Sequence, residues 1–95
     1  MITSFGNQET EDIYSGISTK AAKGVPSVLW NIANRKLDTI NAAHDLKDVR
    51  IPVNNRFELL KAKRQGFYSI HVNDQYRIIF RWIENGAKEV AIIDD

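Results

Sequence analysis

The sequence predicts an α+β fold in which N-terminal helices pack on one face of a mostly antiparallel β-sheet. Apolar residues recur at steps of three and four up to Ala43, and from Arg56 onward they alternate with a period of two. Helices therefore come first and strands follow. The connections between the later strands are too short for parallel crossovers, so we expect an antiparallel meander.

Length and composition predict one small globular domain over residues 1–95. The chain is 43% hydrophobic and 26% charged, which excludes a disordered, collagen-like or coiled-coil protein. It has no Cys and two His, so neither a disulfide framework nor a Cys- or His-built metal site is expected. It shows no secretory signal, and no run approaches the roughly 18 apolar residues of a membrane span. We expect a cytoplasmic protein.

The N-terminal half is predicted to form one short strand and two helices. Residues 2–5 form the strand, and Asn7 caps a helix that runs through Tyr14 and stops near Gly16. Pro26 opens the longest helix, because Pro is tolerated at the first helical position. An apolar stripe on this helix must face a sheet or another helix, and it consists of Leu29, Ile32, Ala33, Leu37, Ile40 and Ala43.

The C-terminal half is predicted to form four strands. A helical turn at residues 45–49 and an extended loop at residues 51–55 come before them. Asn85-Gly86 is the strongest hairpin signal and predicts the turn between the last two strands. The expected strands are Arg56–Leu60, Phe67–Val72, Tyr76–Ile83 and Glu89–Ile93.

The register follows if apolar side chains share one face across paired strands. Pairing Val72 with Tyr76 across a three-residue loop places His71 opposite Arg77. With the two-residue Asn-Gly turn next along the chain, Arg77 lies opposite Asp94. One face then forms the core under the long helix. The other face displays polar side chains, namely His71, Arg77, Arg81 and Asp94.

Positive charge concentrates near this polar face. The net charge of the chain is only +1, but residues 50–82 hold seven basic and two acidic side chains. Residues 61–66 form a basic loop at the entrance to the face. Lys and Arg clustered on one surface are typical of nucleic-acid binding. A solvated loop and a cross-strand ion pair between Arg77 and Asp94 would give the same pattern without a ligand.

The residue pattern excludes several kinds of catalytic site. No carboxylate or His cluster falls at metal-ligand spacing, and there is no glycine-rich phosphate loop. A metal-free cationic surface remains. RNA carries its own nucleophile, the 2′-hydroxyl, so cations and proton-transfer groups at the phosphate suffice for its cleavage. His71 is a candidate for proton transfer, and a half-buried packing role is the alternative.

Two segments carry a specific resemblance to a known family. Residues 55–66 and residues 69–82 resemble the HigB toxins, including the GraT branch, of the RelE/ParE superfamily, and residues 1–5 and 35–43 are also similar. The resemblance implies a small bacterial α+β toxin that cleaves mRNA on the ribosome without a cofactor. It also implies a HigA-type helix-turn-helix antitoxin, with which the toxin binds operator DNA and represses its own promoter.

The resemblance further implies roles for individual residues. Lys61 and Arg64 match the family's loop cations, which hold the RNA backbone. Arg77 matches the strand arginine that stabilises charge on the scissile phosphate. With His71 and Asp94 these residues form the predicted catalytic set. Neighbouring cations are predicted to bind RNA, namely Arg56, Lys63 and Arg81.

The sequence departs from the family pattern at a few positions. Some members carry His where Glu58 stands and Gly where Ala62 stands. The family commonly ends in Asp-Tyr-His, whereas Asp95 follows Asp94 here. Two alternatives therefore stay open, a catalytically weakened antitoxin-binding co-repressor module and a ParE-like gyrase inhibitor. The loop cations together with Arg77 favour RNA cleavage over gyrase inhibition.

Overall fold

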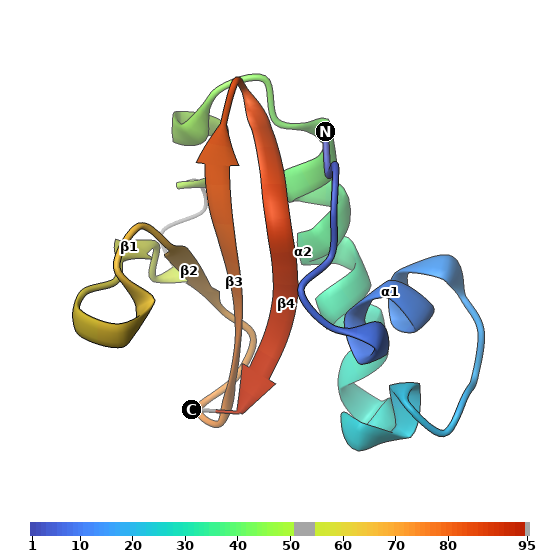
Figure 1. Cartoon of the computed structure of the whole chain (residues 1–95). Coiled ribbons are helices and arrows are strands. Elements are labelled where there is room, and N and C mark those ends of the chain that lie inside the picture. The colour runs from blue at the N-terminus through green and yellow to red at the C-terminus, as the bar shows by residue number, and fades with distance from the viewer. Residues whose placement is uncertain (51–54, 95) are drawn as a thin grey trace.

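A computed structural model describes residues 1–50 and 55–94 of the chain. Two α-helices, α1 (Gln8–Ser15) and α2 (Trp30–Ala42), lie on one side of an antiparallel sheet with strand order β1-β2-β3-β4 (Figure 1). The predicted α+β arrangement and the antiparallel meander are confirmed. The strands are β1 (Glu58–Leu59), β2 (Tyr68–His71), β3 (Tyr76–Ile83) and β4 (Gly86–Asp94).

Helix α1 begins and ends as its sequence predicts. The Asn7 side chain accepts a hydrogen bond from the backbone N–H of Thr10 at 3.0 Å, which satisfies one of the unpaired donors of the first turn. Gly16 ends the helix in the left-handed region, with φ of 77°. Inside the helix, the buried Thr10 hydroxyl accepts a hydrogen bond from the Ile92 backbone N–H at 2.8 Å and so ties α1 to β4.

Helix α2 starts later than predicted. Pro26 precedes a short 3₁₀ helix, η2 (Ser27–Leu29), and the α-helix begins only at Trp30. The buried stripe of α2 consists of Ala33, Leu37 and Ile40, as expected. Ile32 was expected in the stripe but is 37% exposed. It directly precedes Ala33 in the chain and therefore faces a different side of the helix. No helix in the described ranges is long and apolar enough to cross a membrane.

The core lies between α2 and the apolar face of the sheet. The register of β2 against β3 is the predicted one, since His71 pairs with Arg77 and Ile70 with Ile78. Side chains alternate across a strand, so this register places one set toward the helices and the other on the open face. The completely buried hydrophobic side chains of the sheet are Ile70, Ile78, Phe80, Ala87 and Val90.

The predicted register of β3 against β4 is wrong. Glu84 and Asn85 both have positive φ, 52° and 61°, and form the two-residue turn, so Gly86 already belongs to β4. A bulge between Ile79 and Arg81 then shifts the pairing by one residue. Arg77 consequently pairs with Ile93, and Asp94 pairs with Tyr76 rather than with Arg77. The Asn-Gly signal identified the hairpin but placed its turn one residue late.

The other predicted boundaries hold in part. Strand β1 is shorter than the expected Arg56–Leu60, because Arg56 takes a positive φ of 49° just before it. The helical turn at residues 45–49 is confirmed as η3 (Leu46–Val49), capped by the Asp45 side chain. Of the expected loop at residues 51–55, only Asn55 lies within the described residues.

The N-terminal segment closes the β4 edge of the sheet. Ile2 and Phe5 form isolated parallel bridges to Ala87 and Val90, so the predicted N-terminal strand is present in minimal form (Figure 1). Gly6 follows where the backbone of β4 comes close, and a Cβ there would lie 2.9 Å from the Glu89 carbonyl oxygen. This contact allows only glycine at position 6 without a backbone shift.

The corrected turn makes a stability prediction. The left-handed conformation of Glu84 costs about 1 kcal/mol through steric repulsion, and Asn tolerates this conformation better than Glu does. We expect Glu84→Asn to raise the free energy of unfolding by up to about 1 kcal/mol in urea denaturation, whereas Glu84→Ala leaves it nearly unchanged. If Glu84 instead belonged to a strand before an Asn85-Gly86 turn, Glu84→Asn would destabilise the protein.

Candidate functional site

A cavity of about 370 Å³ opens beside β1, β2 and β3 on the open face of the sheet. Three predicted site residues, Arg56, His71 and Arg77, line it together. Among the described residues, the lining is Arg56, Phe57, Glu58, Ser69, His71, Asp74 and Arg77. Strand alternation explains the grouping, because Ser69, His71 and Arg77 point away from the buried Ile70 and Ile78.

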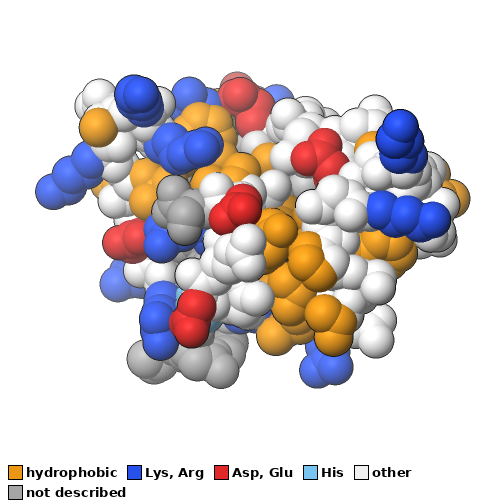
Figure 2. Space-filling model, turned by 90° about the horizontal axis from the view of Figure 1, so that it is seen from below, with side chains coloured by type: hydrophobic (Ala, Val, Ile, Leu, Met, Phe, Trp, Pro, Cys, Tyr) orange, Lys and Arg blue, Asp and Glu red, His pale blue; other side chains and the backbone are white. Residues whose placement is uncertain are grey.

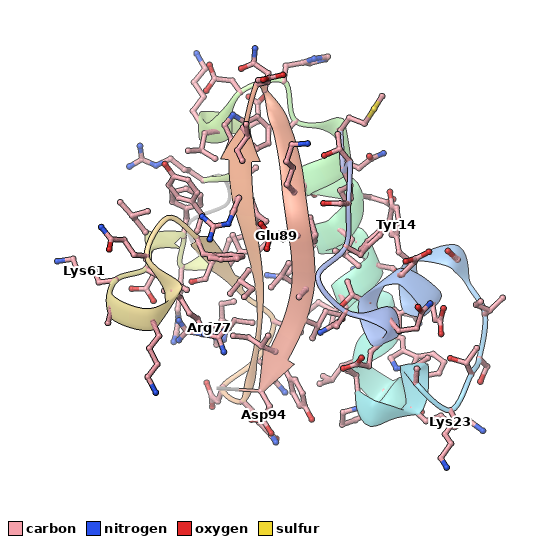
Figure 3. All side chains as sticks on the ribbon, in the orientation of Figure 1. Tyr14, Lys23, Lys61, Arg77, Glu89 and Asp94 are labelled. Atoms are coloured by element: carbon pink, nitrogen blue, oxygen red, sulfur yellow. The ribbon has the colours of Figure 1, made fainter. Side chains whose placement is uncertain are left out.

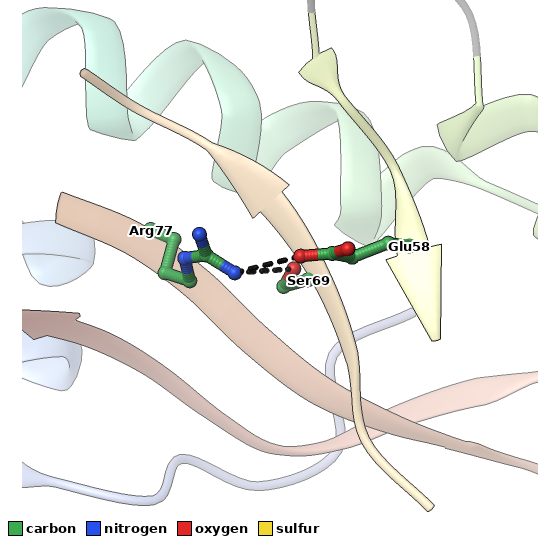
Figure 4. Close-up of polar contacts among 3 residues, drawn as sticks. All are labelled: Glu58, Ser69 and Arg77. Atoms are coloured by element: carbon green, nitrogen blue, oxygen red, sulfur yellow. Dashed lines mark hydrogen bonds and ion pairs between the residues drawn. The ribbon is translucent and has the colours of Figure 1, made fainter. Parts of the chain in front are cut away.

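Arg77 of β3 donates hydrogen bonds to acceptors on β1 and β2. Its Nη1 donates to Glu58 Oε1 at 2.8 Å and to the buried Ser69 hydroxyl at 3.5 Å (Figure 4). The Arg77 side chain is 31% exposed and that of Glu58 is 55% exposed, so solvent screens this ion pair. Such pairs contribute about 1 kcal/mol at most. The contact therefore aims the guanidinium into the cavity and remains easy to exchange for another anion.

The same geometry corrects the ion pair that the sequence suggested for Arg77. Glu58, which the sequence marked only as a departure from the family, replaces Asp94 as its carboxylate partner. Asp94 lies at the end of β4, where its Oδ2 accepts a hydrogen bond from Gln75 Nε2 at 3.1 Å (Figure 3). The structure thus separates Asp94 from the lining of the Arg77 cavity. Its predicted catalytic role stays a prediction.

His71 lies opposite Arg77 in the register and lines the same cavity. Burial lowers the pKa of its imidazole below the usual 6.5, and the positive charge of Arg56 lowers it further. The Asp74 carboxylate acts in the opposite direction on this pKa, but more weakly than Arg56. His71 is therefore neutral at pH 7, and its ring nitrogens can accept or donate a hydrogen bond.

Lys36 of α2 lies close enough to His71 to affect its pKa, and the sequence did not predict it as a site residue. Lys36 Nζ donates to Asn55 Oδ1 at 2.7 Å, and burial lowers the Lys36 pKa from its usual value. Asn55 is buried and donates in turn to the Val49 carbonyl at 3.3 Å. The Lys36 charge also lowers the pKa of His71. The sequence signal that could have found Lys36 is its spacing, because it lies three residues after Ala33 and next to Leu37 of the buried stripe.

The basic loop contributes a separate cationic surface. Lys61, Lys63 and Arg64 are exposed and line a second hollow of about 370 Å³ with Leu60 and Ala62. Figure 3 shows Lys61 at the outer end of this loop, on the same side of the sheet as Arg77. Seen from below, Lys and Arg side chains also gather on the side of the molecule that β1, β2 and the loop occupy (Figure 2).

Arg81 points toward the loop and not into the cavity. Its guanidinium carbon lies 4.3 Å from the centre of the Phe67 ring, and its Nε is 2.9 Å from Glu89 Oε2. The Arg81 and Glu89 side chains are 36% and 55% exposed, so solvent screens this ion pair as it does that of Arg77. The stack on Phe67 is the additional contact that holds the Arg81 guanidinium. In the described part of the chain, no group of three or more His, Cys, Asp or Glu could hold a metal ion.

Comparisons with known proteins identify the family of the chain. The family model described as "RelE-like toxin of type II toxin-antitoxin system HigB" matches residues 2–94. The chain belongs to the HigB-like toxin family. Toxin HigB-1 of Vibrio cholerae is 39% identical over 87 residues, which cover 92% of this chain and 90% of that protein. An uncharacterized protein of Haemophilus influenzae is 44% identical over 68 residues, or 72% of this chain and 67% of that protein.

Solved structures show that the fold is shared beyond close HigB relatives. A chain of the YoeB–YefM complex from Staphylococcus aureus superimposes with a TM-score of 0.59. The match covers 96% of this HigB-like chain and 92% of the other, at 16% sequence identity. The resemblance found in the sequence is confirmed at the level of family and fold.

The environment of His71 makes a prediction about pH. We expect its imidazole to titrate below 6.5 in an NMR titration, and Arg56→Ala to raise this pKa, because the arginine charge disfavours protonation. The unfolded chain binds the proton more tightly, so the free energy of unfolding should fall as the pH drops below 6.5 toward the folded pKa. The His71→Gln variant should lose this part of the pH dependence. A folded-state pKa at or above 6.5 would contradict the assignment.

Proposed function

We propose that this HigB-like toxin is a ribosome-dependent mRNA endonuclease that works without a metal ion. One observation carries the proposal, namely a single cavity that Arg77 lines together with a carboxylate, a hydroxyl and an imidazole. Cleavage of a phosphodiester by the 2′-hydroxyl needs a cation that stabilises the charge developing on the phosphoryl oxygens. It also needs a base that takes the 2′-hydroxyl proton. Arg77 fits the first role and Glu58 the second.

The proposed reaction begins when RNA enters the cavity. A phosphate competes with Glu58 for the Arg77 guanidinium, because both are anions and the ion pair is exposed to solvent. The released carboxylate accepts the proton of the 2′-hydroxyl, whose oxygen attacks the adjacent phosphorus. The bond to the 5′ oxygen breaks, and this oxygen takes a proton from water. The products are a 2′,3′-cyclic phosphate and a 5′-hydroxyl.

Residues around the cavity support binding of the RNA strand. Arg56 lines the cavity, and Lys61, Lys63 and Arg64 extend the cationic surface along the loop. Contacts of this type position the phosphate backbone without selecting sequence. Phe57 is partly buried in the cavity wall, where its ring stacks on Tyr68 with the ring centres 5.2 Å apart and lies 5.7 Å from the Arg50 guanidinium carbon. Phe57 therefore shapes the wall against which the RNA would lie.

The proposal includes the cell compartment and the partners. Translated mRNA and ribosomes place the activity in the cytoplasm of a bacterium. The family belongs to type II toxin–antitoxin systems, and the fold matches a chain solved in the YoeB–YefM complex. We infer a HigA-type helix-turn-helix antitoxin, which would neutralise the toxin and carry it to operator DNA as a co-repressor.

The first test removes the cation at the phosphate. Arg77→Ala should lower the rate of mRNA cleavage on programmed ribosomes by about 10² to 10³, the usual cost of losing a donor to a developing oxyanion. Primer extension on a reporter mRNA measures the cut sites. Arg35→Ala removes the same charge from the exposed surface of α2 and serves as the control. Full cleavage by folded Arg77→Ala protein would refute the proposal.

The second test identifies the base. If Glu58 takes the proton, Glu58→Gln lowers cleavage by about 10² to 10⁴ and removes the acidic limb of the pH–rate profile. His71→Gln should keep that limb with a modest loss of rate. The reverse result would assign the base to His71. Asp94→Asn tests another predicted catalytic residue, and a small effect is expected because Asp94 does not line the cavity.

The alternatives have distinct outcomes. A wild-type chain that binds its antitoxin and operator but cuts no mRNA is a co-repressor module. Recovery of cleavage after addition of a C-terminal Tyr-His would show that the missing activity lies in that motif. Inhibition of gyrase supercoiling in the absence of mRNA cleavage would instead support a ParE-like activity.

A further inference from the structure

Arg81 lies on the open face of β3, four residues after Arg77. The sequence predicts a catalytic role for Arg77 and an RNA-binding role for Arg81. Their partners differ. Arg77 faces the cavity, whereas Arg81 stacks on Phe67 at 4.3 Å and pairs with Glu89 at 2.9 Å. Phe67 is the residue at which the basic loop rejoins the sheet, just before β2.

The loop backbone lies directly against the Arg81 guanidinium. Gly66 has a φ of 89°, and a Cβ on it would lie 2.8 Å from Arg81 Nη1. Phe67 N–H donates to the Arg64 carbonyl at 3.0 Å and closes the loop at this point. The guanidinium thus touches the last residue of the loop and the aromatic ring that follows it.

Glu89, the partner of Arg81, is itself fixed. It occupies the β4 bulge with a φ of 54°, and its backbone N–H donates to the Ser4 hydroxyl at 2.9 Å. Gly6 packs against its carbonyl oxygen. A continuous chain of contacts therefore runs from the N-terminal segment through Glu89 and Arg81 to the basic loop.

We propose that Arg81 is a positioning residue that holds the basic loop, residues 61–66, on the sheet and does not itself bind RNA. The proposal deepens the proposed function, because this loop carries Lys61 and Arg64. Fixing the loop before RNA arrives reduces the ordering cost that two long cationic side chains would otherwise bring to binding. Arg77 supplies charge at the reacting phosphate, and Arg81 sets where the loop cations stand relative to it.

The first experiment tests in the free protein whether Arg81 holds the basic loop on the sheet, a role called the brace below. It needs no cleavage activity. Backbone ¹⁵N relaxation should show residues 61–66 losing order in Arg81→Ala and Arg81→Lys, from an order parameter near 0.85 toward about 0.6. Lys cannot reproduce the planar stack on Phe67, so the conservative variant should not rescue the loop. Unchanged loop order in both variants would overturn the proposal.

The second experiment uses the sign of the Glu89→Gln effect on binding to programmed ribosomes. If Arg81 bound RNA, releasing it from Glu89 would tighten binding. If Arg81 braces the loop, Glu89→Gln weakens binding, by up to about tenfold, with the rate at saturation retained. Glu84→Gln removes a charge from the turn of the same hairpin and reports the effect of charge alone. Tighter binding by Glu89→Gln than by this control would refute the brace.

A third comparison separates the brace from the proposed function. Lys61→Ala should cost less binding in an Arg81→Ala background than in the wild type, because the loop cation is already misplaced there. Additive losses would mean that the two cations bind RNA independently, which contradicts the brace. If the wild type neither binds nor cleaves mRNA on ribosomes, the endonuclease proposal fails, while the relaxation result still decides the structural role of Arg81.

Discussion

The bulge at Glu89 in β4 is the constraint on which the open face of the sheet depends. The tight turn at Glu84 and Asn85 starts β4 in a register that, continued unchanged, would pair Arg77 with Ile92. A slip of one residue in a strand moves every side chain to the other face. The extra residue at the bulge corrects the register, so that Ile92 is buried opposite Ile78.

The bulge also joins parts of the chain that are far apart in sequence. Ser4 and Gly6 of the N-terminal segment contact Glu89. The Thr10 hydroxyl of α1 accepts a hydrogen bond from the nearby Ile92 backbone N–H. These contacts cover the β4 edge, which would otherwise expose unpaired backbone groups. The opposite edge, at the two-residue strand β1, carries Glu58 and the cavity. The two edges of the sheet thus differ, because the N-terminal segment covers one and the cavity opens at the other.

Local signals in the sequence predicted the elements well, and non-local pairing set the limit. The Asn7 cap, the stripe of α2 and the pairing of His71 with Arg77 each follow from side-chain periodicity or from a short loop. The turn at Glu84 was missed because positive φ at Glu is uncommon and the adjacent Asn-Gly pair is a stronger signal. The bulge has no such signal, because a Glu and not a Gly occupies the left-handed position.

The candidate site shows the same difference between local signals, which the sequence carries, and non-local pairing, which it does not. Periodicity placed His71 and Arg77 on one face, but it could not supply Glu58, whose position depends on the register of β1 across the basic loop. Lys36 and Asn55 meet only when α2 packs beside the start of β1. Side chains that belong to different elements in this way become neighbours through tertiary packing, which a pattern within one element does not encode.

Charge counting in the sequence has a related physical limit. The segment of residues 50–82 has an excess of Lys and Arg, which suggests a uniform RNA-binding surface. Two of its arginines face different partners. Each pairs with a carboxylate whose side chain is 55% exposed, but Arg77 lines the cavity, whereas Arg81 stacks on Phe67. The chemistry available to each cation therefore depends on what else its guanidinium contacts. A charge count does not distinguish a cation that lines a cavity from one that stacks beside a loop on the same strand face.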